Sequence, residues 1–408
     1  MRLIGLSFTF LLLCIINIQA QNSISINDAV RSSIENNIEL KKQKTQIRKT
    51  ESYLSEAGRI PNPAFNYSRE DLKLNNFKVG EWIASGSIPL NFLWERWSNV
   101  EAKEKSLEAE KLLLENSIQS VSVQVKNAYL NYHFLTQLTK ELNAALKKIN
   151  LAAESAKQKV KQGDIPEYEL QRILLEVNKF SAEMKRIEIE KSNSLSELKL
   201  FMGFTGNDIS TEGVILNPVS FSLEELLKSA SRNRKDLKAI DKLIESEKAF
   251  LSHNKMKIFP SISLTAGYKK QADDFSGSVM QLSFEIPLFK RNQLEIDLSE
   301  NELNSLLYQR NFLVNKIQEE ISIALTKYLQ YKEFYEYNKI VEPQELFTTA
   351  AYSYEQGEKS LVEFLDGLNA YKDALILNKD FELNYCQSFF ELQKAAALNT
   401  VNEIIKGE

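Results

Sequence analysis

One stretch of the chain, from 91 to 162, places apolar residues with the period of a helix and contains neither glycine nor proline. The apolar positions recur at intervals of three and four: Val121, Val125, Ala128, Tyr132, Leu135, Leu138, Leu142, Leu146, Ile149, Ala153, Ala156 and Val160. This spacing predicts one face of a packed antiparallel pair or a coiled coil. At 1.5 Å per residue, a helix of roughly 70 residues extends about 105 Å, several times the width of a compact domain.

A turn and a returning helix follow this stretch. Gly163 provides a helix stop, and Asp164 and Pro166 are typical of the start of the next helix. The helical pattern then continues from 167 to 201. The sequence therefore predicts a long helical hairpin with its turn at Gly163.

The same order of elements occurs twice, with landmarks that recur at intervals of roughly 195 to 200 residues. The pairs are Pro61 and Pro260, Ile88-Pro89-Leu90 and Ile286-Pro287-Leu288, Tyr129-Leu130-Asn131-Tyr132 and Tyr328-Leu329-Gln330-Tyr331, and Gln162-Gly163 and Gln356-Gly357. A repeat of this length is far above the range of solenoid repeats. We expect a first repeat over 21–215 and a second repeat over 216–408.

In the second copy, the outgoing helix is predicted from 292 to 356, with a turn at Gly357 and a return from 360 to about 405. Pro343 lies inside the outgoing helix, and a kink is expected there.

Ahead of each long helix the period changes from 3.6 to 2. The alternation predicts four strands of about ten residues, joined in pairs by polar loops at 72–78 and 271–276. Aromatic residues near the strand ends, Tyr67, Trp82 and Tyr268, suit a membrane interface. Strands of this length cross a bilayer when tilted in a barrel. The alternative is an antiparallel sheet that caps a soluble helical protein.

Four strands cannot close a barrel, and an open sheet edge is not tolerated in hydrocarbon because its amides would lack partners. Three chains would supply twelve strands, which is within the range of bacterial barrels. The predicted fold class is therefore mainly α with a membrane β-barrel: long antiparallel hairpins form an α-barrel, and each chain adds four strands to a trimeric barrel.

The segment 1–20 has the pattern of a secretory signal. Arg2 gives the basic start, an apolar run follows from 3 to 18, and Ala20 gives the small-residue exit. An uncleaved anchor is the alternative for this segment. Lipid attachment at Cys14 is not expected, because Leu13 precedes it where a small residue is required.

Charge and composition exclude several classes of function. The 408 residues carry a formal net charge of −4, which gives no electrostatic reason to expect nucleic-acid binding. His133 and His253 each stand alone on a helical pattern, so neither a metal site nor a cofactor is expected. The sequence contains no Gly-rich phosphate loop and no nucleophile–base pattern, so an enzyme is not expected. Beyond the signal, Cys386 has no second cysteine to pair with.

Two segments resemble the outer-membrane efflux family, the TolC-like exit ducts. The stretch 353–366 resembles the family's tip signature, Tyr-x-x-Gly-x-x-Ser-x-x-acid-x-Leu-acid, and the first copy matches it more weakly around Gly163 and Glu169. Ala57 to Pro63 resembles the Pro-Asn-Pro entry of the heavy-metal branch, the CzcC- and CusC-like proteins. The resemblance implies a homotrimer in the outer membrane that extends into the periplasm. It also implies a periplasmic adaptor and an inner-membrane RND-type pump as partners, with metal cations as the substrate.

The resemblance also implies a periplasmic gate at the helix tips. Tyr354 and Lys359 match its tethering positions, while Glu363, Asp366 and their first-copy counterpart Glu169 match its acidic positions. Three copies of the carboxylates around an axis would favour cations. The alternative is that these charges belong to an ordinary solvated helix end.

Two other functions stay open at this point. A periplasmic coiled-coil adaptor also carries long hairpins, but it has one hairpin among several β segments. A structural coiled-coil protein would lack the strands before each hairpin.

Overall fold

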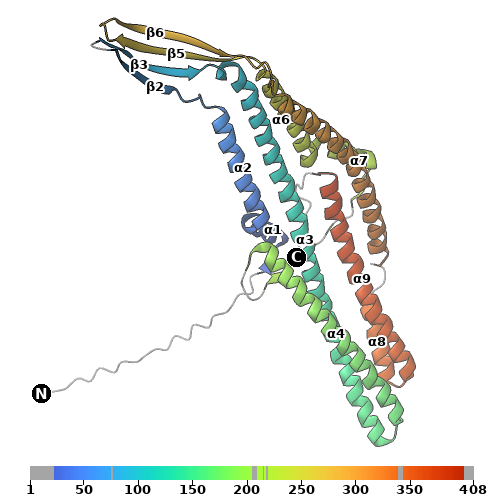
Figure 1. Ribbon diagram of the computed structural model, residues 1–408. Helices are drawn as coiled ribbons and strands as arrows, with labels where there is room; N and C mark the ends of the chain where they lie inside the picture. Colours follow the sequence, from blue (N-terminus) through green and yellow to red (C-terminus); the bar gives the residue numbers. More distant parts are fainter. Residues whose placement is uncertain are drawn as a thin grey trace, which may run out of the picture.

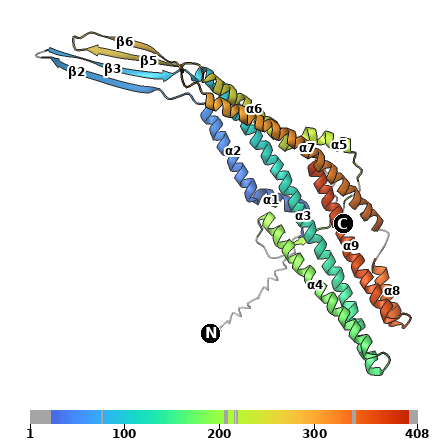
Figure 2. The same ribbon diagram turned by 45° about the vertical axis from the view of Figure 1, so that its right-hand side comes forward.

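The computed structural model describes residues 23–74, 77–204, 209–214, 216, 219–338 and 343–398 of the chain. Figure 1 shows an elongated molecule, with a four-stranded sheet at one end and two helical tips at the other. Figure 2, turned by 45°, shows the same separation of sheet and tips. The helices between them run along the long axis.

The elements of the two halves follow the same order. The first half contains β1 Ser23–Ile24, α1 Ile26–Asn36, α2 Ile38–Ala57, β2 Ala64–Leu74, β3 Phe77–Pro89, α3 Phe92–Gln162 and α4 Glu167–Met202. The second half contains β4 Ser210–Thr211, α5 Leu223–Asn233, α6 Lys235–Met256, β5 Ser261–Gln271, β6 Ser276–Glu285, α7 Gln293–Asn338, α8 Pro343–Glu355 and α9 Leu361–Ala395.

The first helical hairpin agrees with the sequence prediction almost to the residue. Helix α3 has 71 residues and α4 has 36, and Gly163 lies between them in the left-handed conformation with φ of 82°. The outgoing helix of the second hairpin is described in two parts, α7 up to Asn338 and α8 from Pro343. Residues 339–342, next to the kink predicted at Pro343, lie outside the described residues.

The returning helix α9 ends at Ala395, so the prediction that it continues to about 405 overran the helix. Ala397 adopts φ of 47°, and the N–H of Leu398 donates to the carbonyl of Gln393 at 3.0 Å. This left-handed stop closes the helix without a glycine. Residues 399–405 of the predicted helix lie outside the described residues.

The strands also differ from the prediction in one place. The loop expected at 72–78 is too long, because β2 continues to Leu74 and β3 begins at Phe77. The loop expected at 271–276 is confirmed, since β5 ends at Gln271 and β6 begins at Ser276.

The four long strands form one antiparallel sheet in the order β2-β3-β5-β6. The inner pair, β3 and β5, joins the two halves of the chain, with Trp82 opposite Lys270 and Ile88 opposite Leu264. Strands β2 and β6 are therefore the two edges of the sheet among the described residues. A separate short parallel pair, β1 and β4, lies in the helical part.

Two apolar clusters hold the helices together. The first cluster packs α1, α3, α7 and α9 around the fully buried rings of Tyr129, Tyr328 and Phe389. The second cluster fills the hairpins near the tips, where Ile149 and Phe364 are almost completely buried. Burial of each such side chain contributes about 1.5–3 kcal/mol. The two clusters account for the continuous helical rod between sheet and tips.

Candidate functional site: a two-faced sheet and the helix tips

The sheet has one apolar face and one polar face. Directly opposed residues of antiparallel strands point to the same side, so the register sorts every side chain. One face collects Phe65, Tyr67, Trp82, Ala84, Ile88, Ile262, Leu264, Ala266, Tyr268, Met280, Leu282 and Phe284, and toward the strand loops it also carries Arg69, Asp71, Lys73, Lys270, Ser276 and Ser278. The other face collects Asn66, Ser68, Glu70, Glu81, Ser85, Ser87, Ser263, Thr265, Lys269, Gln271, Gln281, Ser283 and Glu285, together with the apolar side chains of Ala64, Leu72, Val79, Ile83 and Val279.

The apolar face is uncovered. Phe65 is 77% exposed and Met280 is 78% exposed, although both side chains are apolar. The helices begin where the strands end and do not pack over the sheet (Figure 1). An apolar face of this extent, left bare by the rest of its own chain, marks a surface that another apolar phase or partner covers.

Three aromatic rings lie together on the apolar face, near the middle of the strands rather than at the strand ends expected from the sequence, because Tyr67 and Tyr268 both lie level with Ala84 of β3. The Trp82 ring centroid is 6.4 Å from that of Tyr67 and 5.9 Å from that of Tyr268. Tryptophan and tyrosine concentrate at membrane–water interfaces because their rings are apolar on one side and polar on the other. The sequence pattern predicted these three residues as interface aromatics, and the strand register brings their rings close together.

The polar face carries a cluster of charges. Glu70 lies directly opposite Glu81, and the ammonium of Lys269 forms an ion pair with Glu81. Two like charges directly opposite each other destabilise a strand pair, and the Lys269 ammonium offsets that repulsion. This cluster could not be found from the sequence, because only the strand register brings the three residues together.

At the opposite end of the molecule, two glycines turn the helical hairpins. Gly163 and Gly357 have φ of 82° and 76°. Each turn has the same closing bond: the N–H of Asp164 donates to the carbonyl of Lys159 at 2.9 Å, and that of Glu358 donates to Ser353 at 2.9 Å. Only glycine adopts this conformation without a steric cost.

Tyr354 is buried between helices rather than presented to solvent. Its ring stacks on Phe364 at 4.9 Å with an interplanar angle of 13°, and the Nζ of Lys159 lies 5.6 Å from its centroid. Burial, together with the negative charge of Glu169, raises the pKa of the phenol. The hydroxyl is buried and has no hydrogen-bond partner among the described residues. Tyr354 therefore contacts α9 and the tip of α3 within one chain.

Lys359 and Glu363 belong to one helix start. Glu363 accepts hydrogen bonds from the N–H and the hydroxyl of Ser360 at 2.9 and 3.0 Å, which is a capping box at the start of α9. Lys359 forms an ion pair with Glu363 at 3.3 Å. These contacts lower the pKa of Glu363, with the Ser360 N–H as the largest cause.

The two remaining acidic residues differ in their exposure to solvent. Asp366 is exposed one turn after Glu363 on α9, and Glu169 is half-buried near the start of α4. In the sequence, only the tip motif relates these carboxylates to one another. In one chain they do not form a shared ion-binding cluster, since no group of three potential metal ligands occurs among the described residues.

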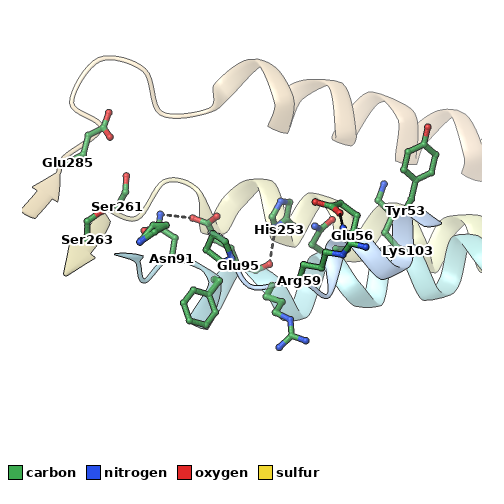
Figure 3. A pocket seen from close by; sticks show the side chains of 16 residues that line it. Tyr53, Glu56, Arg59, Asn91, Glu95, Lys103, His253, Ser261, Ser263 and Glu285 are labelled. Atoms are coloured by element: carbon green, nitrogen blue, oxygen red, sulfur yellow. Dashed lines mark hydrogen bonds and ion pairs between the residues drawn. The ribbon is translucent and has the colours of Figure 1, made fainter. Parts of the chain in front are cut away.

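A cavity of 660 Å³ lies at the junction of sheet and helices (Figure 3). Tyr53 of α2, Lys103 of α3, His253 of α6 and Glu285 of β6 line it. The Nδ1 of His253 lies 3.0 Å from the carbonyl of Glu95, and burial lowers the pKa of the imidazole. The lining mixes charges of both signs and presents no nucleophile–base arrangement.

In the part of the chain that the structure describes, no helix is both long and apolar enough to cross a membrane.

No family model matches the sequence, and no curated protein matches it. Solved structures do match the fold. A membrane protein from Pseudomonas aeruginosa is 16% identical with a TM-score of 0.76, over 93% of each chain. The Campylobacter jejuni CmeC outer membrane channel is 17% identical with a TM-score of 0.74, over 91% of this chain and 85% of that one. CusC, described for transmembrane channel formation, is 17% identical with a TM-score of 0.72, over 91% of each chain.

The heavy-metal branch is not singled out by these comparisons, because CusC and CmeC are equally identical to this sequence. All three alignments extend over more than nine tenths of this chain. The chain has the fold that these membrane proteins share.

Proposed function

We propose that this protein is the outer-membrane exit duct of a tripartite efflux pump, a passive channel from the pump across the periplasm and the outer membrane. The observation that carries the proposal is the two-faced sheet. Its bare apolar face suits lipid and its polar face suits a water-filled lumen, as in membrane barrels. The helix α3, at about 1.5 Å per residue, then extends the conduit by about 105 Å.

The proposed assembly is a homotrimer. Strands β2 and β6 each leave one row of backbone groups unpaired within the chain, and such rows require partners in lipid. Pairing β6 of one copy with β2 of the next closes a twelve-stranded barrel. The helical hairpins of the three copies then form the α-barrel, which a periplasmic adaptor joins to an inner-membrane RND-type pump.

Metal cations are the proposed substrate class. The support is the Pro-Asn-Pro segment that ends at Pro63 and the exposed carboxylates of Glu363 and Asp366 at the tip. The pump sets most of the selectivity in such an assembly, and the duct contributes the charge of its openings.

The two alternatives are less well supported. A coiled-coil adaptor or a structural protein gives no reason for a four-stranded sheet with one bare apolar face. Both alternatives predict that the sheet tolerates a charge equally well on either side.

Two neighbouring substitutions on β6 test this distinction. Met280 lies on the apolar face and is 78% exposed, whereas the adjacent Gln281 lies on the polar face. We expect Met280→Lys to reduce membrane-inserted trimer strongly, because a lysine on the lipid face costs about 2–4 kcal/mol near the bilayer centre. Gln281→Lys is the matched control and should assemble and conduct in planar bilayers.

Heat-modified migration of the detergent-extracted protein reports assembly, and bilayer conductance reports the channel. Equal trimer yield for Met280→Lys and Gln281→Lys would contradict the lipid-facing sheet. Assembled trimer that never conducts would contradict the duct.

A further inference from the structure

Short connections join the sheet to the helices, and they all lie at the end of the sheet that is next to the helical part (Figures 1 and 2). They run from α2 to β2, from β3 to α3, from α6 to β5 and from β6 to α7. Together they form the border between the bare apolar face of the sheet and the helices. In the proposed duct, this border lies at the periplasmic surface of the outer membrane.

Each connection, or the first turns of the helix beside it, exposes a large apolar side chain. Phe289 is 97% exposed between β6 and α7, and Trp97 is 71% exposed near the start of α3. Ile60 and Phe259 are exposed in the other two connections. Single exposed apolar residues are common on protein surfaces, but here one occurs at every passage between sheet and helices.

A basic residue stands next to an exposed apolar residue at every one of these passages. The neighbours in the sequence are Arg59 and Ile60, Arg96 and Trp97, Lys257 and Ile258, and Phe289 followed by Lys290 and Arg291. The combination occurs in both repeats, although the sequences differ. Next to a membrane, such a pair places the apolar side chain among the acyl chains and the cation among the headgroups.

Most of these cations have no acidic partner. Arg59 forms an ion pair with Glu56 at 3.0 Å. The cations without an ion pair among the described residues are Arg96, Lys257, Lys290 and Arg291. The guanidinium of Arg96 instead lies 5.8 Å from the ring centroid of Trp97, and its Nε is buried without a hydrogen-bond partner in the described part of the chain.

The loop end of the sheet is organised differently. There, Arg69 forms an ion pair with Asp71 at 2.9 Å, and Lys270 forms one with Asp274 at 3.4 Å. These cations are neutralised by their own chain, whereas the four at the junction of sheet and helices are not. The junction therefore carries positive charge that an external anion can balance.

A neighbouring copy does not supply the missing carboxylates. In the proposed barrel, β6 of one copy pairs with β2 of the next, so the connection after β6 lies beside the connection before β2. The first contains Lys290 and Arg291. The second begins after Glu56, which already pairs with Arg59. No free carboxylate of this pair is left for the cations of the adjacent copy.

We propose that the junction of sheet and helices binds the phosphate headgroups of anionic phospholipids, with Arg96, Lys257, Lys290 and Arg291 as the cations that contact them. This inference rests on the proposed function, because it takes the sheet as the membrane-spanning part. The exposed apolar side chains enter the acyl layer, and the cations hold the duct at a fixed depth. Clusters of lysine and arginine beside a spanning segment attract anionic lipid in this way.

The test is native mass spectrometry of the detergent-extracted trimer, with phosphatidylglycerol and phosphatidylcholine as the probes. Both lipids contain a phosphate, but only phosphatidylglycerol has a net negative charge. We expect the wild type to bind phosphatidylglycerol at least about tenfold more tightly at low salt. Lys290→Gln with Arg291→Gln should weaken the binding of phosphatidylglycerol at least about fivefold and leave that of phosphatidylcholine unchanged.

Lys228→Gln with Arg232→Gln is the matched control. Both residues are exposed on α5, which lies in the helical part away from the sheet, and the pair removes the same charge (Figure 2). This variant should keep the lipid preference of the wild type. Equal binding of the two lipids by the wild type, or an equal loss in both variants, overturns the proposal.

The other possible occupants have distinct outcomes. Loss of trimer in Lys290→Gln with Arg291→Gln would mean that these cations contact a neighbouring copy. Displacement of phosphatidylglycerol by inorganic phosphate at equal ionic strength would make a free anion the ligand, and either result overturns the proposal. A conducting trimer without lipid preference contradicts the headgroup site alone, whereas equal trimer yield for Met280→Lys and Gln281→Lys contradicts the lipid-facing sheet itself.

Discussion

Tyr129 and Tyr328, which occupy equivalent positions in the two repeats, hold the connection between the two halves of the chain in the same way. The hydroxyl of Tyr129 accepts from the N–H of Glu212 at 2.7 Å and donates to the carbonyl of Ile24 at 2.7 Å. The hydroxyl of Tyr328 accepts from the N–H of Val219 at 3.1 Å and lies 2.7 Å from the carbonyl of the same residue. Each repeat thus uses its equivalent tyrosine to hold one end of the segment 212–219.

Removal of either phenol oxygen should destabilise the helical part. Tyr129→Phe and Tyr328→Phe keep the buried rings but remove hydrogen bonds to backbone groups that are only partly buried, which costs about 0.5–1.5 kcal/mol per hydrogen bond. We expect a lower urea midpoint for both variants by circular dichroism. Tyr337→Phe is the control, because Tyr337 is 70% exposed on the same helix as Tyr328. A midpoint as low for Tyr337→Phe as for the other two would contradict a role for the buried hydroxyls.

Stability should fall as the pH drops from about 7.5 to 5.5. Burial, assisted by the positive charge of Lys379, lowers the pKa of His133, and burial lowers the pKa of His253. The unfolded chain therefore binds protons first, near the ordinary histidine pKa of about 6.5. The stability that these neutral imidazoles allow is present above that pKa and is lost as the pH falls through it.

The measurement is the urea midpoint at several pH values. The variant His133→Gln/His253→Gln contains no histidine, because the chain has two, and its midpoint should be nearly flat over this range. The Nε2 of His133 lies 2.8 Å from the Nε2 of Gln137, which is a hydrogen-bond donor. Protonation of the imidazole would place a second N–H donor opposite it. An equal slope with and without histidines would assign the dependence to other groups.

The two ends of the molecule should differ in access from outside the cell. Asp274 lies between β5 and β6 with a side chain that is 91% exposed, and Asp164 is exposed at the tip of the first hairpin. An impermeant thiol reagent on intact cells should label Asp274→Cys and not Asp164→Cys. Both should be labelled after the cells are opened, which controls for burial. The opposite pattern on intact cells would invert the proposed orientation.

The charge of the tip opening should depend on two exposed carboxylates. Glu363→Gln with Asp366→Asn should reduce the cation preference of the reversal potential in planar bilayers. Glutamine still completes a capping box, so α9 should start at the same residue. A matched pair further along α9, Asp373→Asn with Glu382→Gln, should leave the preference unchanged. A tip variant with the wild-type preference would remove these residues from the opening.

A resting closure at the tip should weaken when its contacts are removed. Tyr354→Phe with Lys359→Ala should raise single-channel conductance without lowering trimer yield, with Lys161→Ala as the control at the same end. An exposed ion pair contributes only about 0.2–1 kcal/mol, so the effect depends on three symmetric copies acting together. Unchanged conductance would show that the buried Tyr354 stabilises the hairpin alone.

The long helices could be predicted from the sequence because their signals are local. A glycine-free run with one apolar stripe gave the first hairpin, and Gly163 marked its turn. The end of α9 could not be predicted, because its left-handed stop is at Ala397, where no glycine marks it. The polar residues Lys73, Asn75, Asn76 and Lys78 suggested a loop over 72–78, whereas pairing with β3 extends β2 through Leu74.

The residues of the candidate site at the tip could be predicted from the sequence, but their contacts could not. The tip motif identified Tyr354 and Glu363 by type and spacing, but the ring stack with Phe364 and the approach of Lys159 depend on packing between hairpins. The polar face of the sheet was missed because Glu81 and Lys269 belong to different halves of the sequence and meet only through the β3–β5 register.

The open edges at β2 and β6 have a consequence for how the molecule matures. In the proposed homotrimer, the two unpaired edges of this sheet find their hydrogen-bond partners in neighbouring copies, so the last step of folding is association with another chain. Folding and association are then one reaction, and its yield rises with the concentration of newly exported chains. Until that encounter, each edge is equally open to any other unpaired strand, so a delay in meeting the right partner exposes the chain to aggregation.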